Sequence, residues 1–123
     1  MKPMIISWNV WGLNDYRKCL WVKNLIRKWR ADVICFQETK LKFVSQTIVN
    51  SLCRFQYVGW VELVSKGASG GIIVMWDRRV VEMLDHYVGE FMVVCQFKSV
   101  DDGFEWVFAG VYGPKVYNSR RIL

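Results

Sequence analysis

Short apolar runs and one amphipathic stretch alternate along the first third of the chain. Residues Met4–Val10 and Val33–Gln37 are brief, continuous and rich in Ile and Val, as is typical of buried strands. Between them, Tyr16–Trp29 has apolar residues repeating at i, i+3, i+4 and i+7, the spacing of one helical face. These positions are Val22, Leu25, Ile26 and Trp29. A strand, a helix and a strand with short joints predict a right-handed βαβ unit whose strands run parallel.

Beyond the second strand the pattern changes from helical to strand-like. Ser45 is predicted to cap a short helix that runs through Leu52. The predicted strands that follow are Tyr57–Leu63, Gly71–Trp76, Val80–Tyr87, Phe91–Phe97 and Glu105–Val111. The stretches "WDRRV" and "SVDDGF" are typical of hairpin turns, and a last helix is predicted to begin near Asn118. We therefore expect an α/β fold that begins with the βαβ unit and continues as an antiparallel meander.

Composition and charge narrow the class of protein. A chain of 123 residues forms at most one domain, and a hydrophobic content of 53% with a mean hydropathy of +0.13 excludes a disordered tail. The 17 Lys and Arg residues against 11 Asp and Glu residues give a net charge of +6, which favours polyanion partners such as nucleic acid. The basic residues of the predicted helix have a simpler interpretation as a solvated face.

The cysteines and the N-terminus bear on metal sites and on location. The four cysteines include no CxxC pair, and three of them lie among apolar residues as small buried side chains do, so zinc is not supported. The N-terminus lacks the apolar segment and cleavage site of a signal peptide. The longest apolar run, "GGIIVMW", is too short to cross a bilayer. We expect no membrane contact and a location in the nucleus or cytoplasm.

Two polar residues stand where the first two predicted strands end. Asn9 closes the first strand, and Glu38 follows the second, so parallel neighbouring strands would bring them to one edge of the sheet. A carboxylate beside an amide suits Mg²⁺, whose octahedron is completed by substrate phosphate and water. Taken alone, each has a simpler interpretation, as a turn-forming Asn bonded to nearby backbone and as a Glu in a surface loop.

Two later segments also carry candidate chemistry. "KGASGGIIVMW" is glycine-rich but leads into a strand, whereas a phosphate-binding P-loop opens a helix. Its glycines are interpreted as allowing a tight turn or a close backbone approach, with Ser69 as a candidate donor to phosphate. "GVYGP" places Tyr112 at another strand end, where a phenol can orient a scissile phosphate. The commoner interpretation of such a Tyr is a packed ring with a satisfied hydroxyl.

In this order, these segments resemble the motifs of the endonuclease/exonuclease/phosphatase family. "SWNVWGL" is similar to its first motif, "QETK" to its second, "GASGGIIVMW" to its glycine-rich strand and "GVYGP" to its tyrosine motif. The amino-acid sequences of these motifs most resemble those of the endonuclease domain at the start of plant LINE-type (non-LTR) retrotransposon polyproteins. The resemblance covers almost the whole chain. The resemblance implies a DNase I-like two-sheet α/β sandwich, hydrolysis of a phosphodiester with Mg²⁺ or Mn²⁺, and DNA as the partner.

The resemblance also implies roles for individual residues. Asn9 would help to place the catalytic groups, Tyr112 would contact the scissile phosphate, and Glu38 would bind the metal. Asn14 and Lys40 are second-rank candidates for contacts to nucleic acid. The family's first motif often has Arg, Asn or a similar polar residue where this chain has Trp11. This difference weakens one candidate phosphate contact, although an aromatic ring can instead pack or stack on a base.

The sequence also departs from the family pattern. A "GDFN"-like motif and a terminal motif with Asp and the catalytic His are both absent, and the only histidine, His86, lies within a predicted strand. We therefore interpret residues 1–123 as a partial domain, the N-terminal half of the sandwich, without an evident general base.

Three hypotheses follow from this interpretation. The leading one is a catalytically incomplete fragment of a Mg²⁺-dependent DNA endonuclease of retroelement origin. The others are a non-catalytic basic remnant that binds nucleic acid, and a retroelement remnant with no selected function. Half a sandwich leaves an apolar face uncovered, so self-association or a need for the missing half is expected.

Overall fold

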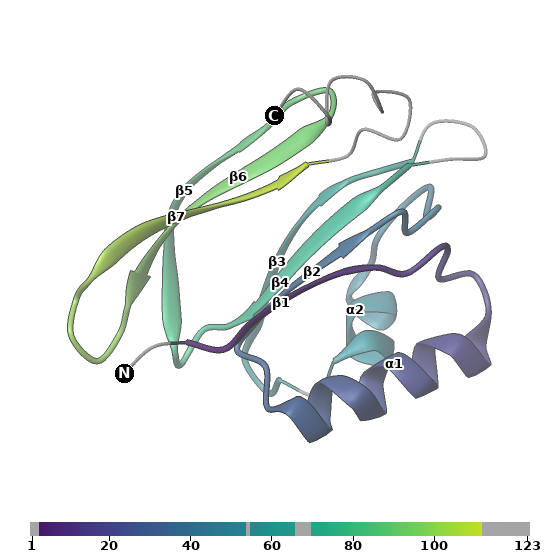
Figure 1. The fold of residues 1–123 in the computed structure, drawn as a ribbon, viewed down its shortest axis with the longest axis horizontal. Helices are drawn as coiled ribbons and strands as arrows, with labels where there is room; N and C mark the ends of the chain where they lie inside the picture. Colours follow the sequence, from purple (N-terminus) through teal and green to yellow (C-terminus); the bar gives the residue numbers. More distant parts are fainter. Residues whose placement is uncertain (1–2, 54, 66–69, 112–123) are drawn as a thin grey trace, which may run out of the picture.

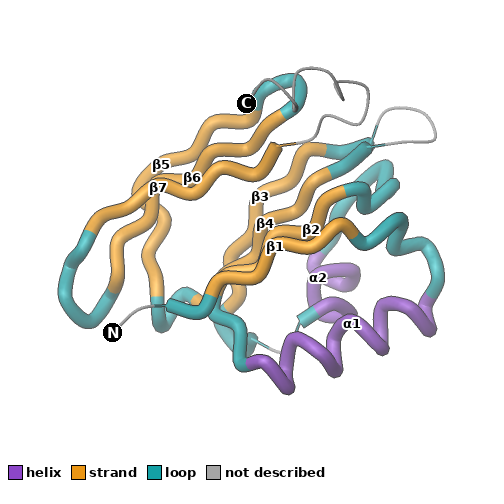
Figure 2. The backbone as a smooth tube through the Cα atoms, viewed as in Figure 1, coloured by secondary structure: helices purple, strands orange, loops and turns teal. Residues whose placement is uncertain are grey.

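The computed structural model describes residues 3–53, 55–65 and 70–111, and within them two β-sheets and two helices form three layers (Figure 1). The elements are β1 (Ile5–Asn9), α1 (Tyr16–Trp29), β2 (Val33–Gln37), α2 (Gln46–Leu52), β3 (Val58–Leu63), β4 (Ile72–Asp77), β5 (Val81–Val88), β6 (Met92–Ser99) and β7 (Glu105–Val111). The first sheet has the order β1-β2-β4-β3 and the second β5-β6-β7. The helices cover the face of the first sheet that points away from the second sheet (Figure 2).

The βαβ unit has the predicted form. β1 and β2 pair in parallel, with Asn9 opposite Gln37 at their ends. The helix begins after Asp15, whose carboxylate accepts a hydrogen bond from Arg17 N at 2.9 Å and so satisfies one free donor of the first turn. It ends at Arg30, which adopts the left-handed conformation with φ of 53°. The helix therefore has the bounds predicted from its apolar repeat.

Two apolar layers stabilise the fold. β2 and β4 lie at the centre of the first sheet, and β4 is buried along its whole length because both faces of the sheet are covered. This double burial explains why these strands are continuous apolar runs rather than alternating ones. One core cluster, which includes Val22 and Phe36, lies between the helices and the first sheet. The second, which includes Trp76, Cys95 and Phe97, lies between the sheets.

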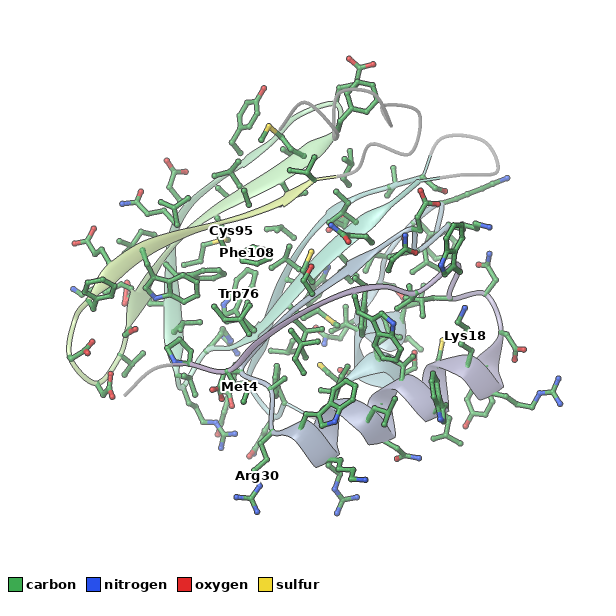
Figure 3. All side chains as sticks on the ribbon, viewed as in Figure 1. Met4, Lys18, Arg30, Trp76, Cys95 and Phe108 are labelled. Atoms are coloured by element: carbon green, nitrogen blue, oxygen red, sulfur yellow. The ribbon has the colours of Figure 1, made fainter. Side chains whose placement is uncertain are left out.

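Aromatic rings join the two sheets. The ring of Phe97 in β6 lies 5.3 Å from that of Trp76 in β4 and 5.0 Å from that of Trp106 in β7, measured between centroids. Figure 3 shows Trp76 and Cys95 in the space between the sheets. Such ring pairs add about 0.5–1.5 kcal/mol beyond the burial of their area. The Trp76–Phe97 pair joins β6 to the first sheet, and the Phe97–Trp106 pair extends this cluster to β7.

All four cysteines are buried and form no disulfide bond. They pack in the core as small apolar residues do. Burial raises the pKa of the Cys35 thiol to about 12 and that of the Cys95 thiol to about 11. Both thiols therefore stay protonated at neutral pH and act as packing groups.

The link between β4 and β5 is not the predicted hairpin. β4 is paired on its two edges by β2 and β3, so no edge is left for β5, which pairs with β6 in the second sheet. At this crossing the Asp77 carboxylate accepts hydrogen bonds from the side chain of Arg79 at 3.0 and 3.1 Å. The turn in "SVDDGF" does join β6 to β7 as predicted, with Gly103 at φ of 74°. The meander is thus confirmed for β5–β7 but broken after β4.

The exposed surface differs from the prediction at one position of α1. Trp29, expected on the buried stripe, is 43% exposed and packs on Trp8 of edge strand β1, with ring centroids 5.9 Å apart. Most basic residues of the helix are exposed, as a solvated face requires. In the part of the chain that the structure describes, no helix has the length and apolar character needed to cross a membrane.

The second sheet leaves large apolar side chains exposed. Among them are Tyr87 of β5 and Val107 and Val111 of β7, each more than half exposed. This agrees with the uncovered face expected of half a sandwich, while self-association stays a prediction. The helix expected near Asn118 lies outside the described residues.

Replacing Phe97 with Ala is expected to lower the free energy of unfolding by about 3–5 kcal/mol, because the fully buried ring leaves a cavity between the sheets. The matched control is Phe104→Ala, since Phe104 is 64% exposed after β6 and its loss should cost less than about 1 kcal/mol. Urea unfolding followed by circular dichroism measures both. Equal destabilisation by the two substitutions would contradict this packing.

Candidate active site

The loops that follow β1 and β2 are joined by backbone hydrogen bonds at one edge of the first sheet. Gly12 N donates to Glu38 O at 2.6 Å, and Leu13 N donates to Thr39 O at 2.8 Å. The parallel pairing of the two strands therefore continues past their ends. It brings Asn9 and Glu38 to the same edge of the sheet, as the sequence predicted.

Glu38 is buried, with only 5% of its surface exposed. Its Oε2 accepts a hydrogen bond from Gly70 N at 3.3 Å, whereas its Oε1 is buried with no partner among the described residues. Its backbone has φ of 57°, a left-handed conformation that costs about 1–2 kcal/mol in a residue with a side chain. The interpretation of Glu38 as a surface loop residue is therefore wrong. Burial, strain and an unpaired carboxylate oxygen together are typical of a ligand site.

The unpaired oxygen of Glu38 fits a hard divalent cation. Mg²⁺ is commonly held by one or two carboxylates, with waters and substrate phosphates completing its shell. Over residues 3–53, 55–65 and 70–111, no group of three or more His, Cys, Asp or Glu side chains comes together. Among the described residues, Glu38 is the carboxylate that would hold such an ion.

A pair of glycines fixes the loop that carries Glu38. Gly70 O accepts a hydrogen bond from Lys40 N at 2.8 Å, and Gly71 O accepts one from Thr39 N at 3.2 Å. Both glycines have positive φ, and a Cβ on Gly71 would overlap Thr39 Oγ1. This confirms that the glycine-rich segment serves a close backbone approach. Ser69, the candidate phosphate donor of this segment, lies outside the described residues.

The side chain of Asn9 fixes the turn after β1. Its Oδ1 accepts a hydrogen bond from Trp11 N at 3.2 Å, which is the local turn contact expected of such an Asn. The contact supports the left-handed backbone of Trp11, whose φ is 54°. A role for Asn9 in placing catalytic groups stays a prediction.

Asn14 and Lys40, the candidates for nucleic-acid contacts, lie together at this edge. Asn14 Nδ2 donates to Lys40 O at 3.4 Å. The side chain of Lys40 passes over Gly12, since its Cδ lies 3.4 Å from where a Cβ of that glycine would stand. Their contacts with nucleic acid stay predictions. Tyr112, the candidate for the scissile phosphate, lies outside the described residues.

Two residues near this edge were not predicted as candidate site residues from the sequence. Gln37 Nε2 donates to Val111 O at 3.0 Å and so ties the end of β2 to the end of β7 across the sheets. Its position directly before Glu38 was the available signal. Ser65 Oγ is buried without a partner among the described residues, and Ser65 N donates to Leu41 O at 2.9 Å. Nothing in its local pattern distinguishes it.

Comparison with known proteins decides the family. The Endonuclease/Exonuclease/phosphatase family matches residues 6–115, a range that includes all of β1 except Ile5, the Glu38 loop and the glycine pair. The chain belongs to this family. Among curated proteins, no sequence matches it.

Solved structures agree with this family fold. The human Nocturnin catalytic domain with a bound sulfate anion has a TM-score of 0.63 at 10% identity, over 87% of this chain and 48% of that one. AP endonuclease LMAP from Leishmania major has a TM-score of 0.62 at 17% identity, over 88% and 39%. Humanized D. rerio TDP2 has a TM-score of 0.61 at 18% identity, over 95% and 50%. The predicted α/β sandwich is confirmed, and the chain spans about half the length of these structures or less.

Gly71→Ala is expected to destabilise the chain more than Gly103→Ala. Both glycines have positive φ, so each substitution adds the same kind of backbone strain, about 1–2 kcal/mol. At Gly103 a Cβ has room, with Lys98 Cε 3.7 Å away, whereas at Gly71 it overlaps Thr39. Urea unfolding of the two variants gives the difference. Equal losses would contradict the close packing of the glycine pair on the Glu38 loop.

Proposed function

We propose that this chain is part of a Mg²⁺-dependent DNA endonuclease domain of retroelement origin, which binds DNA but is catalytically incomplete. The observation that carries the proposal is the buried Glu38, whose Oε1 has no partner among the described residues. A protein core does not retain such a carboxylate without a ligand or a large stability cost.

The residues around Glu38 support the metal-site part of the proposal. When bound, Mg²⁺ polarises a phosphoryl oxygen and offsets the charge that develops on it. Glu38 would hold the ion through Oε1, while its Oε2 stays fixed by Gly70 N. Lys40 adds a positive charge beside Gly12, where it can meet a neighbouring phosphate.

Several observations support DNA as the partner. The net charge is +6, and the fold resembles that of an AP endonuclease. The sequences of the motifs, above all "NVWGL", "QETK" and "VYGP", resemble those of retroelement endonucleases. This resemblance supports a retroelement origin. A nuclear or cytoplasmic location is part of the same proposal.

Incomplete catalysis follows from the groups that hydrolysis requires. Cleavage of a phosphodiester needs a positioned water, a base to take its proton and stabilisation of the developing charge. The chain carries the proposed metal ligand Glu38 and the proposed phosphate contact Lys40, but the "GDFN"-like and Asp-His motifs are absent from the 123 residues. The only histidine, His86, lies in β5 opposite Cys95. The same facts favour a second candidate, a non-catalytic nucleic-acid-binding remnant.

Nicking of supercoiled plasmid DNA tests the proposal. The wild-type chain and Glu38→Gln are each incubated with Mg²⁺ and with a chelator, after circular dichroism has shown that both are folded. We expect no metal-dependent nicking from either, because no base takes the proton of the attacking water. Mg²⁺-dependent nicking that is lost in Glu38→Gln would show a working site and contradict the claim of incomplete catalysis.

A salt titration of DNA affinity completes this test. Binding to DNA should weaken steeply as salt rises, because each phosphate contact releases counterions. Measurable, salt-dependent binding without nicking is the expected result. Absence of binding even at low salt would contradict the proposed function and favour a remnant with no selected function.

A further inference from the structure

Trp11 has a large, exposed apolar side chain in the loop that bonds to the backbone of Glu38. Trp11 is 69% exposed, and its backbone has φ of 54°. A left-handed residue is ordinarily Gly or Asn, because a side chain costs about 1–2 kcal/mol there. Exposure means that the ring gains little from burial to offset this strain. Packing within the described residues therefore gives no reason for Trp at this position.

The backbone of Trp11 is nevertheless fixed from several sides. Its N–H donates to Asn9 Oδ1 at 3.2 Å, and its carbonyl accepts from Lys18 Nζ at 3.2 Å. The next residue, Gly12, donates to Glu38 O at 2.6 Å. The ring is thus carried on a rigid turn that is bonded directly to the metal-ligand residue.

Other exposed tryptophans of the chain have a structural explanation that Trp11 lacks. Trp21 and Trp29 of α1 pack on the ring of Trp8, with centroids 5.6 and 5.9 Å apart. For Trp11, no ring partner is found among the described residues. The exposed ring of Trp11 is therefore accessible to a ligand.

Two lysines give the surroundings of Trp11 a positive charge. Lys18 rises from α1 towards the loop after β1 and reaches the carbonyl of Trp11 (Figure 3). Lys40 passes over Gly12, the residue that follows Trp11. An exposed indole on a loop with cationic side chains is the combination that binds single-stranded nucleic acid, where bases stack and phosphates are neutralised.

We propose that Trp11 is a base-stacking residue that makes this edge prefer nucleic acid with unpaired bases. This rests on the function proposed above, because the Trp11 loop is bonded through Gly12 to the backbone of Glu38, the proposed metal ligand. In a duplex both faces of each base are already stacked, whereas an unpaired base offers a free face to the indole. Trp11 therefore acts in substrate selection, and Asn9 is its positioning residue.

Fluorescence anisotropy with labelled oligonucleotides tests this inference. The probes are a single strand, an abasic strand of equal length and charge, and a duplex of the same sequence. Trp11→Ala is expected to weaken binding of the single strand at least about fivefold, which is the low end of the effect of losing one stacked base. Binding of the abasic strand should change little. Trp11→Phe should retain most of the affinity, because it keeps an aromatic face and the same backbone.

A control variant and two contrary outcomes make the test decisive. Phe104→Ala removes an equally exposed ring, 64%, from the turn between β6 and β7 and should leave all three affinities unchanged. Equal loss on the single and abasic strands, or no loss on either, would overturn base stacking while leaving salt-dependent binding intact. If the wild-type chain binds none of the probes, the proposed function fails with it.

Discussion

The continuation of backbone pairing beyond the strand ends is the constraint on which the candidate site depends. The loop after β1 bonds to the loop after β2, and that loop bonds in turn to the glycine pair before β4. These contacts require a glycine at position 71, because any Cβ would overlap Thr39. They turn three loops into one rigid edge, and rigid support is what a preorganised site needs.

This edge carries costs that the rest of the fold must offset. Trp11, Glu38 and Lys40 all have positive φ, and Glu38 keeps a buried oxygen without a partner among the described residues. The two apolar layers around β2 and β4 supply the stability that makes such strain tolerable. Three of the four described non-glycine residues with positive φ lie at this edge, and the fourth, Arg30, ends α1.

Much of the fold and the position of Glu38 were predictable from the sequence, because local patterns and tertiary structure agree there. The bounds of α1, β2 and β7 follow from their apolar repeats, and the position of Glu38 follows from parallel pairing. The path of the chain from β4 to the second sheet could not be predicted from the sequence. A turn sequence such as "WDRRV" does not show that both edges of β4 are already paired. The contact from Gln37 to Val111 was likewise hidden, since it joins residues 74 positions apart. Long-range pairing has no local signal.

The most direct test of the account is the effect of Mg²⁺ on thermal unfolding of the wild-type chain and of Glu38→Gln, against NaCl at equal ionic strength. Without Mg²⁺, the variant should be the more stable, because it removes a buried negative charge. Mg²⁺ should then raise the Tm of the wild type and leave the variant unchanged, because binding to the folded state alone stabilises it. An equal rise in both, or none in either, would contradict a metal site at Glu38.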